Sequence, residues 1–433
     1  MKATQPFLQV FQSRKLASLL LLGFSSGLPL YLTSRTLQAW MQDEKVDLAS
    51  IGLFSLVGLP YSLKFLWSPL LDRFVPPFLG RRRGWLVLTQ VGLLLAIAAM
   101  AFQQPRNALQ FLAINAIIIA FLSATQDIAG DAYRTDVLEV RELGLGASTW
   151  VLGYRIAILV TSALALILAD KIPWSGVYLL MAALMGVGLI TSFWAPEPKG
   201  NSDRPPTSLM DAVYLPFEEF FRRLGLGAGS LTLLFVLLYK VGDALVGNMA
   251  TPFLLAIEFT KTDIGAIQGG MGFLATTVGV IGGGLIVTRI GINRSLWIFG
   301  GLQALSNLGY FCLATVGKNY SFLVLAINLE NLCAGLVTAA FVAYLMSLCN
   351  QRFSATQFAL LSSLMVVCSI ILAAPAGHLA KATGWPGFFL ISLIAALPGL
   401  LLLPFVAPWN PRPVLPELPR DVLDYEDDDS QQL

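Results

Sequence analysis

Long apolar runs recur along the chain and constrain its fold more than any other feature. The first extends from Leu16 to Leu32, and similar runs, separated by short polar breaks, continue almost to Trp409. A hydrocarbon core about 30 Å thick needs roughly 20 apolar residues per spanning helix. Inside lipid, a helix satisfies all of its own backbone hydrogen bonds. The sequence therefore predicts an all-α membrane protein in contact with the lipid bilayer.

The charge content supports a chain embedded in lipid. Only 12% of the 433 residues are charged and 56% are hydrophobic, whereas an average soluble domain has about 25% charged residues. So few charges cannot cover a soluble surface. The net charge is +2, and the cations form no basic stripe interleaved with aromatic residues. We therefore expect no nucleic acid among the partners.

The apolar runs predict about twelve transmembrane helices in two six-helix bundles. The expected spans are 16–36, 50–72, 85–102, 110–134, 145–169, 175–194, 230–257, 263–288, 295–316, 320–349, 355–381 and 387–408. A break at 196–229 separates an N-terminal bundle, 1–195, from a C-terminal bundle, 230–409. Its proline residues and amphipathic pattern predict a cytoplasmic linker at the membrane interface. The acidic segment 410–433 lacks apolar periodicity, so we predict a disordered cytoplasmic tail.

A faint internal repeat relates the two halves. Tyr133, at the end of the fourth predicted helix, is followed eight positions later by Arg141. Tyr344, at the end of the tenth, is followed at the same interval by Arg352, so the offset is 344 − 133 = 211. Parallel repeats of this kind are a known plan of transporters. Loop cations are concentrated on the side of the N-terminus, which predicts that both termini are cytoplasmic.

Ionisable residues inside the predicted spans indicate a polar path. A charge at the bilayer centre costs at least about 2.5 kcal/mol on insertion scales, so it needs a partner or a watery cavity. Asp127, Asp131 and Arg134 recur at i, i+4 and i+7 and therefore share one helix face. We expect Asp127 to pair with Arg155 at similar depth, which leaves Asp131 free to titrate. The interior set is Lys64, Asp127, Asp131, Arg155, Lys240, Asp243 and Glu330.

The interior charges do not balance, because this set has one more carboxylate than cations. A carboxylate without a partner is expected to bind a proton readily. We hypothesise proton coupling through Asp127 or Asp131, with Glu330 or Asp243 as alternatives. A purely structural interpretation, in which buried charges only lock helices together, stays open for each residue taken singly.

The remaining motifs indicate packing and not chemistry. The glycine pairs Gly265/Gly269 and Gly279/Gly283 have the spacing that brings helices close together. The sequence has no Gly-rich phosphate loop, no metal-ligand spacing and no Ser/His/Asp arrangement, and its four cysteines lie singly in apolar runs. We therefore expect no catalytic residue, no metal and no cofactor.

The loop between the second and third predicted helices resembles that of the major facilitator superfamily. It reads Asp72-Arg73, followed after a few residues by the basic cluster Arg81-Arg82-Arg83. On this resemblance we expect the superfamily's fold. We also expect Asp72, Arg73, Arg81 and Arg82 to take part in gating.

Finer motifs resemble the AmpG-type anhydromuropeptide permeases. They are spread from about Phe11 to Val406 and include Lys64-Phe65-Leu66-Trp67, Thr125-Gln126-Asp127-Ile128, Leu152-Gly153-Tyr154-Arg155 and Tyr239-Lys240-Val241-Gly242-Asp243. The resemblance implies a multi-pass symporter of the bacterial inner membrane. Such a protein uses the proton gradient to bring N-acetylglucosaminyl-anhydro-N-acetylmuramyl peptides into the cytoplasm for peptidoglycan recycling, a process tied to β-lactamase induction.

Residues and resemblance together give the expected roles. Proton coupling is expected at Asp127, Asp131 and Glu330. Substrate contacts are expected at Gln126, Tyr154, Arg155, Lys240, Asp243 and Asn331. The expected partners are the anhydromuropeptide, protons and the lipid bilayer, and we expect a monomer.

Other interpretations stay open. A related carrier could move a different bulky acylated or acidic solute, such as acetyl-CoA. A membrane-embedded enzyme acting on cell-wall lipid could also use an intramembrane Asp pair. A transport-like sensor could bind its ligand without translocating it.

Overall fold

The computed structural model describes residues 13–46, 54–106, 108–198, 206, 208–373 and 375–410. Within this part of the chain every regular element is a helix. Ten helical segments in it are long and apolar enough to cross a membrane. The remaining two predicted spans correspond to an interrupted segment, Phe54–Arg73, and to helix α19. The predicted tail beyond residue 410 and residues 199–205 of the linker lie outside the described residues.

The first half of the chain forms one bundle. Its elements are α2 (Arg14–Leu32), α3 (Arg35–Asp43), η1 (Phe54–Gly58), α5 (Leu59–Leu63), η2 (Lys64–Leu66), α6 (Ser68–Arg73), α7 (Gly80–Met100), α8 (Leu109–Val137), η3 (Val140–Glu142), α9 (Leu143–Leu159), η4 (Val160–Leu164), α10 (Ala165–Ala169) and α11 (Trp174–Trp194). The second predicted span is thus a series of short helical pieces. Pro60 and Pro69 stand in the first turns of α5 and α6, and a proline cannot donate the hydrogen bond that would continue the preceding helix.

The second half begins with the linker helix and forms the other bundle. Its elements are α12 (Leu209–Leu224), α13 (Leu226–Leu238), α14 (Val241–Ala256), α15 (Lys261–Ile264), η5 (Gly265–Met271), α16 (Gly272–Ile290), α17 (Ile292–Val316), α18 (Tyr320–Ser347), η6 (Gln351–Phe353), α19 (Ser354–Ala373) and α20 (Ala376–Val406). The predicted seventh helix is broken at Tyr239–Lys240. The predicted boundary between the last two helices lies within α20, at a kink where Gly384 has a φ of 68°.

The offset of 211 residues reappears in the order of the elements. Helices α8 and α18 begin at 109 and 320, η3 and η6 begin at 140 and 351, and α9 and α19 begin at 143 and 354 (354 − 143 = 211). The two bundles therefore contain matching elements in the same sequence order, which supports the internal repeat.

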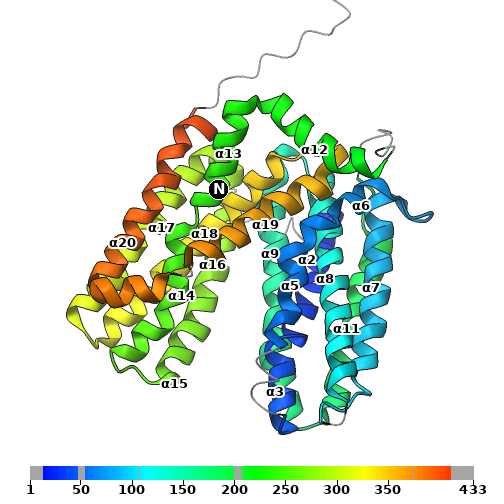
Figure 1. Ribbon diagram of the computed structural model, residues 1–433, viewed down its shortest axis with the longest axis horizontal. Coiled ribbons are helices and arrows are strands. Elements are labelled where there is room, and N and C mark those ends of the chain that lie inside the picture. The colour runs from blue at the N-terminus through cyan, green and yellow to red at the C-terminus, as the bar shows by residue number, and fades with distance from the viewer. Residues whose placement is uncertain are drawn as a thin grey trace, which may run out of the picture.

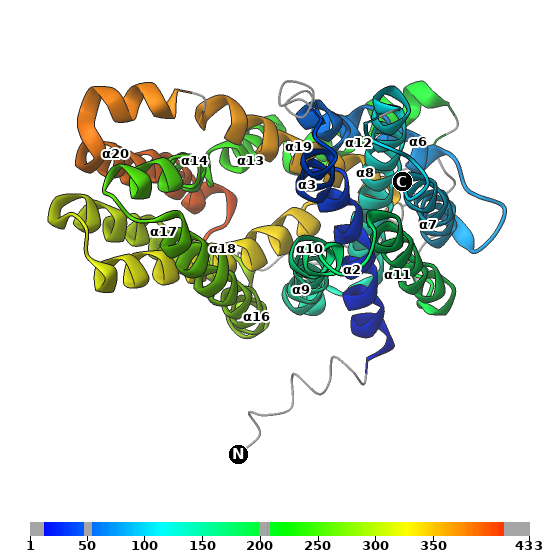
Figure 2. The same cartoon turned by 90° about the horizontal axis from the view of Figure 1, so that it is seen from below.

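The two bundles converge at one end and diverge at the other. Figure 1 shows α12 crossing from one bundle to the other at the converging end, which we call the linker end, while α3 and α15 mark the diverging far end. Viewed from below, the bundles stand side by side as two separate groups of helices (Figure 2).

The apolar cores have the same arrangement. One buried cluster draws side chains from both bundles, including Trp150 of α9 and Phe358 of α19, and it lies at the linker end. A second cluster contains residues of the N-terminal bundle alone. A third contains residues of the C-terminal bundle alone. Hydrophobic burial therefore joins the bundles at the linker end and holds each one together separately toward the far end.

Close helix packing depends on glycine at a few positions. A Cβ at Gly153 would lie 2.0 Å from the carbonyl oxygen of Leu20, so α9 can lie against α2 only without a side chain there. Gly279 likewise faces the backbone of Leu332 on α18. The expected packing of Gly279/Gly283 is confirmed. The expectation for Gly265/Gly269 is wrong, because both face open space in the widened helix η5.

Candidate functional site

Asp131 is the centre of a buried ion cluster in the N-terminal bundle. Its Oδ2 lies 3.2 Å from Lys64 Nζ, and its Oδ1 lies 2.8 Å from an Nη atom of Arg134. Asp131 and Lys64 each expose 11% of their side chains. The interrupted second span delivers Lys64 at the start of η2, whereas Asp131 and Arg134 come from one face of α8. Each oxygen of Asp131 therefore faces its own cation.

Asp127, one turn earlier on α8, has a hydroxyl partner in place of the two cations that pair with Asp131. It accepts a hydrogen bond from the hydroxyl of Ser26 on α2, and it is partly exposed. Its neighbour Gln126 donates to Ser25 Oγ at 3.2 Å. The Oε1 of Gln126 has no hydrogen-bond partner among the described residues.

The expected ion pair between Asp127 and Arg155 is wrong. Among the described residues neither Asp127 nor Arg155 forms a salt bridge, whereas Asp131 pairs with Lys64 and Arg134. Arg155 points toward the other bundle, with its guanidinium 5.9 Å from the ring centre of Phe273 on α16. Counting residues along two helices fixes their relative depth, but it does not fix the direction in which each side chain leaves its helix.

The C-terminal bundle carries a second cluster at the break in the seventh predicted helix. Lys240 precedes the first residue of α14, and Asp243 lies in its first turn, where the helix dipole favours a carboxylate. Both interact electrostatically with Glu330 on α18. All three side chains are partly exposed. Breaks of this kind are typical of binding sites in transporters, because they free backbone groups and charges at mid-membrane depth.

Asn331 connects Glu330 to α16. Its side-chain amide donates to Glu330 Oε2 at 2.9 Å and accepts from the hydroxyl of Thr276 at 2.9 Å. Its amide nitrogen also lies against Gly272, the residue before Phe273. Arg155 of one bundle and Asn331 of the other therefore flank the same turn of α16.

The structure groups the predicted site residues into these two clusters. Gln126 and Tyr154 belong with the N-terminal cluster, where the Tyr154 hydroxyl interacts electrostatically with both Asp127 and Asp131. Asn331 belongs with the C-terminal cluster. Arg155 lies between the clusters, since its contact with Phe273 crosses from one bundle to the other.

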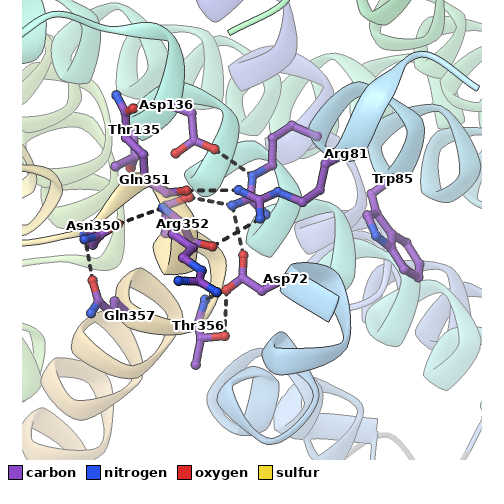
Figure 3. A network of polar contacts seen from close by, with 12 residues as sticks. Asp72, Arg81, Trp85, Thr135, Asp136, Asn350, Gln351, Arg352, Thr356 and Gln357 are labelled. Atoms are coloured by element: carbon purple, nitrogen blue, oxygen red, sulfur yellow. Dashed lines mark hydrogen bonds and ion pairs between the residues drawn. The ribbon is translucent and has the colours of Figure 1, made fainter. Parts of the chain in front are cut away.

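A dense polar network seals the bundles at the linker end (Figure 3). Arg82 forms ion pairs with Asp72 at 2.9 Å and with Asp136 at 2.7 Å. The same guanidinium donates to Ser354 Oγ in the other bundle at 2.7 Å. Arg81 donates to the backbone oxygens of Gln351 and Arg352 at 3.0 and 3.1 Å. Arg81 and Arg82 of α7 therefore connect the two bundles.

Asp72 of the N-terminal bundle also forms hydrogen bonds to the C-terminal bundle. It is fully buried and accepts hydrogen bonds from the backbone N–H of Thr356 at 2.8 Å and from its hydroxyl at 2.7 Å. Thr356 lies in the first turn of α19, whose free N–H groups and helix dipole favour an anion. A carboxylate of one bundle thus caps a helix of the other.

Sequence reasoning found only part of this seal. The sequence also predicted Arg73 for gating, but its guanidinium lies over the ring of Phe74 in its own bundle, 5.6 Å from the ring centre. It missed Asp136, Ser354 and Thr356. The available signal was the run Ser354-Ala355-Thr356-Gln357 before an apolar stretch, which is typical of a helix N-terminus.

The linker helix is attached to the same end. Glu219 of α12 accepts hydrogen bonds from Arg223 at 2.7 Å, from Gln357 at 2.7 Å and from Asn350 at 3.0 Å. Gln357 also donates to the backbone oxygen of Pro216 at 2.9 Å. Burial alone would raise the pKa of Glu219, but these hydrogen bonds lower it below the usual glutamate value.

Comparison with protein families agrees with this architecture. The family model described as Major Facilitator Superfamily matches residues 19–374. The chain belongs to the major facilitator superfamily. As a member of this superfamily it is a multi-pass membrane transporter and not an enzyme.

Two curated relatives narrow the family. The chain is 50% identical over 399 residues to the "Anhydromuropeptide permease" of Escherichia coli strain K12, with 92% of this chain and 80% of the relative covered. It is 35% identical over 407 residues to "Putative transporter AmpG 4" of Rickettsia felis, with 92% and 98% covered. The resemblance to the AmpG-type permeases within the major facilitator superfamily is therefore confirmed.

Solved structures support the fold. The proton:xylose symporter XylE superposes with a TM-score of 0.68 at 11% identity, covering 92% of this chain and 96% of that chain. The human organic anion transporter MFSD10 superposes with a TM-score of 0.64 at 18% identity, covering 92% and 99%. At identities this low, the two solved structures support the major facilitator fold and nothing further.

Proposed function

We propose that this transporter is a proton-coupled symporter that imports anhydromuropeptides, N-acetylglucosaminyl-anhydro-N-acetylmuramyl peptides, from the periplasm for peptidoglycan recycling. The observation that carries the proposal is the 50% identity to the Escherichia coli permease over 92% of the chain. The two clusters of intramembrane charge, one in each bundle, give the proposal a physical basis.

The chemistry of the two clusters suits such a substrate. Anhydromuropeptides carry sugar hydroxyls and acetamido groups together with peptide carboxylates and an amine. The Nε of Arg155 and the Oε1 of Gln126 have no hydrogen-bond partner in the described part of the chain. Lys240 and Asp243 add one charge of each sign. A guanidinium can hold a carboxylate in two-point contact, so we assign Arg155 to the peptide carboxylate.

Alternating access supplies the route. We place the linker end on the cytoplasmic side, because Arg81, Arg82 and Arg83 lie there and the positive-inside rule favours that side. In this orientation the linker-end seal closes the cytoplasmic side while the bundles diverge toward the periplasm. We further propose that the amphipathic helix α12 lies at the cytoplasmic membrane interface, where its exposed Met210 and Tyr214 contact lipid. One chain carries both clusters, so we expect a monomer to suffice.

The proton is assigned to the carboxylates at mid-depth. We assign the proton to Asp127 and Asp131 together, because they lie one turn apart on α8 and share the neighbouring cations Lys64 and Arg134. In the C-terminal bundle we assign the proton to Glu330. Loading of a proton and substrate from the periplasmic side would then be followed by opening of the linker end.

Uptake into proteoliposomes tests the proposal. Labelled anhydromuropeptide should accumulate when an inward proton gradient is imposed, and accumulation should collapse with a protonophore. Replacements D127N, D131N and E330Q should lower gradient-driven uptake, while the same change at the exposed Asp170, D170N, should leave uptake unchanged. Uptake of labelled acetyl-CoA in place of anhydromuropeptide would refute the substrate assignment. Complementation of a permease-deficient bacterium, read as muropeptide loss from the medium, tests the direction.

A further inference from the structure

Arg134 contacts both bundles, although the carboxylate with which it pairs lies in the N-terminal bundle. Its guanidinium forms the 2.8 Å ion pair with Asp131 on its own helix. It also lies 5.3 Å from the ring centre of Trp150 on α9 and 4.8 Å from that of Phe358 on α19. Phe358 belongs to the C-terminal bundle, so this arginine joins the N-terminal ion cluster to the opposite side of the closed linker end.

The surroundings of Arg134 are packed and apolar. The residue is 4% exposed, and its Nε has no hydrogen-bond partner among the described residues. Gly130 makes the geometry possible, because a Cβ there would lie 2.4 Å from the Trp150 ring. Trp150 and Phe358 both belong to the apolar cluster that spans the two bundles. Arg134 therefore depends on nearby carboxylates for charge compensation.

The charges around Arg134 balance only when Asp127 and Asp131 are both ionised. Lys64 and Arg134 face Asp127 and Asp131, and the other titratable groups nearby include Tyr61 of α5, Tyr154 of α9 and Cys349 after α18. Helix α19 contains no charged residue in its sequence. A proton on either carboxylate leaves one buried cation without a partner, and an uncompensated buried charge is strongly destabilising.

We propose that Arg134 is a positioning residue that couples the charge of the Asp127–Asp131 pair to closure of the linker end. While the pair is fully ionised, the guanidinium stays between Trp150 and Phe358 and helps to hold α19 against the N-terminal bundle. When the pair takes up a proton, the excess positive charge is relieved by withdrawal of α19, which admits water to the guanidinium. A proton arriving from the far end thus favours opening of the linker end. The inference rests on the proposed proton coupling, but it does not depend on the identity of the substrate.

The distance between the bundles at the linker end reports this coupling without any substrate. Val140 and Thr288 are exposed, and they line one cavity at the linker end from opposite bundles. Spin labels at V140C and T288C, in a chain whose native cysteines are replaced and which retains its thermal unfolding temperature, give the distribution of closed and open distances in lipid nanodiscs. Acidification should increase the open fraction in this background.

The variants separate coupling from a merely structural role. D131N, which mimics a protonated pair, should increase the ratio of open to closed distances at neutral pH. In an R134Q background, D131N should change that ratio less than about twofold, and the response to acid should be lost. F358L removes only the aromatic contact and should raise the ratio roughly two- to thirtyfold, the range of a partly to fully desolvated cation–π contact.

A matched control removes a cation–π contact that stays within one bundle. Arg14 lies over Trp194 at 5.5 Å, so W194L should leave the ratio unchanged. The proposal is overturned if D131N opens the linker end equally with and without Arg134, or if F358L behaves like W194L. Because neither measurement uses substrate or a gradient, failure here is distinguishable from failure of the proposed transport function.

Discussion

Replacing Asp72 with asparagine should open the linker end, because it removes charge from the centre of the seal while keeping the shape of the side chain. Asp72 is fully buried, and it pairs with Arg82 at 2.9 Å and caps α19 through Thr356. Removing one partner of a buried ion pair costs about 3–5 kcal/mol. Arg82 keeps its second partner, Asp136, so we expect the lower end, about 3 kcal/mol. The cost falls on the closed form alone, because Arg82 is hydrated once the bundles separate.

A cost of about 3 kcal/mol corresponds to a change of roughly a hundredfold in the ratio of closed to open molecules. The V140C/T288C spin-label distances measure that ratio directly. E197Q is the matched control, because it breaks the ion pair of Glu197 with the neighbouring Arg83 within one bundle, and Glu197 exposes 49% of its side chain. Such an exposed pair is worth at most about 1 kcal/mol. If D72N and E197Q gave the same small change, the seal would not hold the bundles together as described.

Three further predictions follow from other parts of the structure. G153A should destabilise the protein in detergent by about 1–3 kcal/mol, the usual cost of overpacking, since its Cβ would meet the Leu20 carbonyl; G186A, with open space around it, should leave the melting temperature unchanged. The lowered pKa of Glu219 means that its bonds stabilise α12 above the usual glutamate pKa of about 4.3 and are lost as pH falls through the lower folded value. The protection factors of the α12 amides against hydrogen exchange should therefore fall below about pH 4 in the native chain and show no such fall in E219Q. R155K keeps the charge but loses the planar contact with Phe273, so we expect a KM for anhydromuropeptide about tenfold higher, a change of about 1.4 kcal/mol, with kcat little changed; an unchanged KM would exclude Arg155 from the binding site.

The positions of the spanning segments could be predicted because they depend on local sequence. Apolar run lengths located most helices, and the offset of 211 residues in the sequence (344 − 133 = 211) recurs in the starts of α8 and α18. The breaks in the second and seventh spans were harder to predict. Pro60 and Pro69 indicate the first break in the sequence. The second break, at Lys240, has no neighbouring proline that would indicate it.

The members of the candidate site could be predicted, but not all of their partners. Asp127 and Asp131 were expected on one face of α8, and both lie in the N-terminal cluster. The pairing of Asp131 with Lys64 depends on how the interrupted second span rotates toward α8, and sequence spacing does not contain that rotation. The partners within the seal could not be predicted for the same reason. Ser354 and Thr356 are typical of any helix N-terminus, and only the packing of the two bundles brings Asp72 and Arg82 into contact with them.

Proton movement on addition of substrate tests the central claim most directly. Proteoliposomes containing the purified protein, a pH-sensitive dye inside and no imposed gradient should acidify internally when anhydromuropeptide is added outside. D127N and D131N should abolish that signal, and D170N should preserve it. Substrate uptake without any accompanying proton influx, or influx that persists in both charge-neutral variants, would contradict the account.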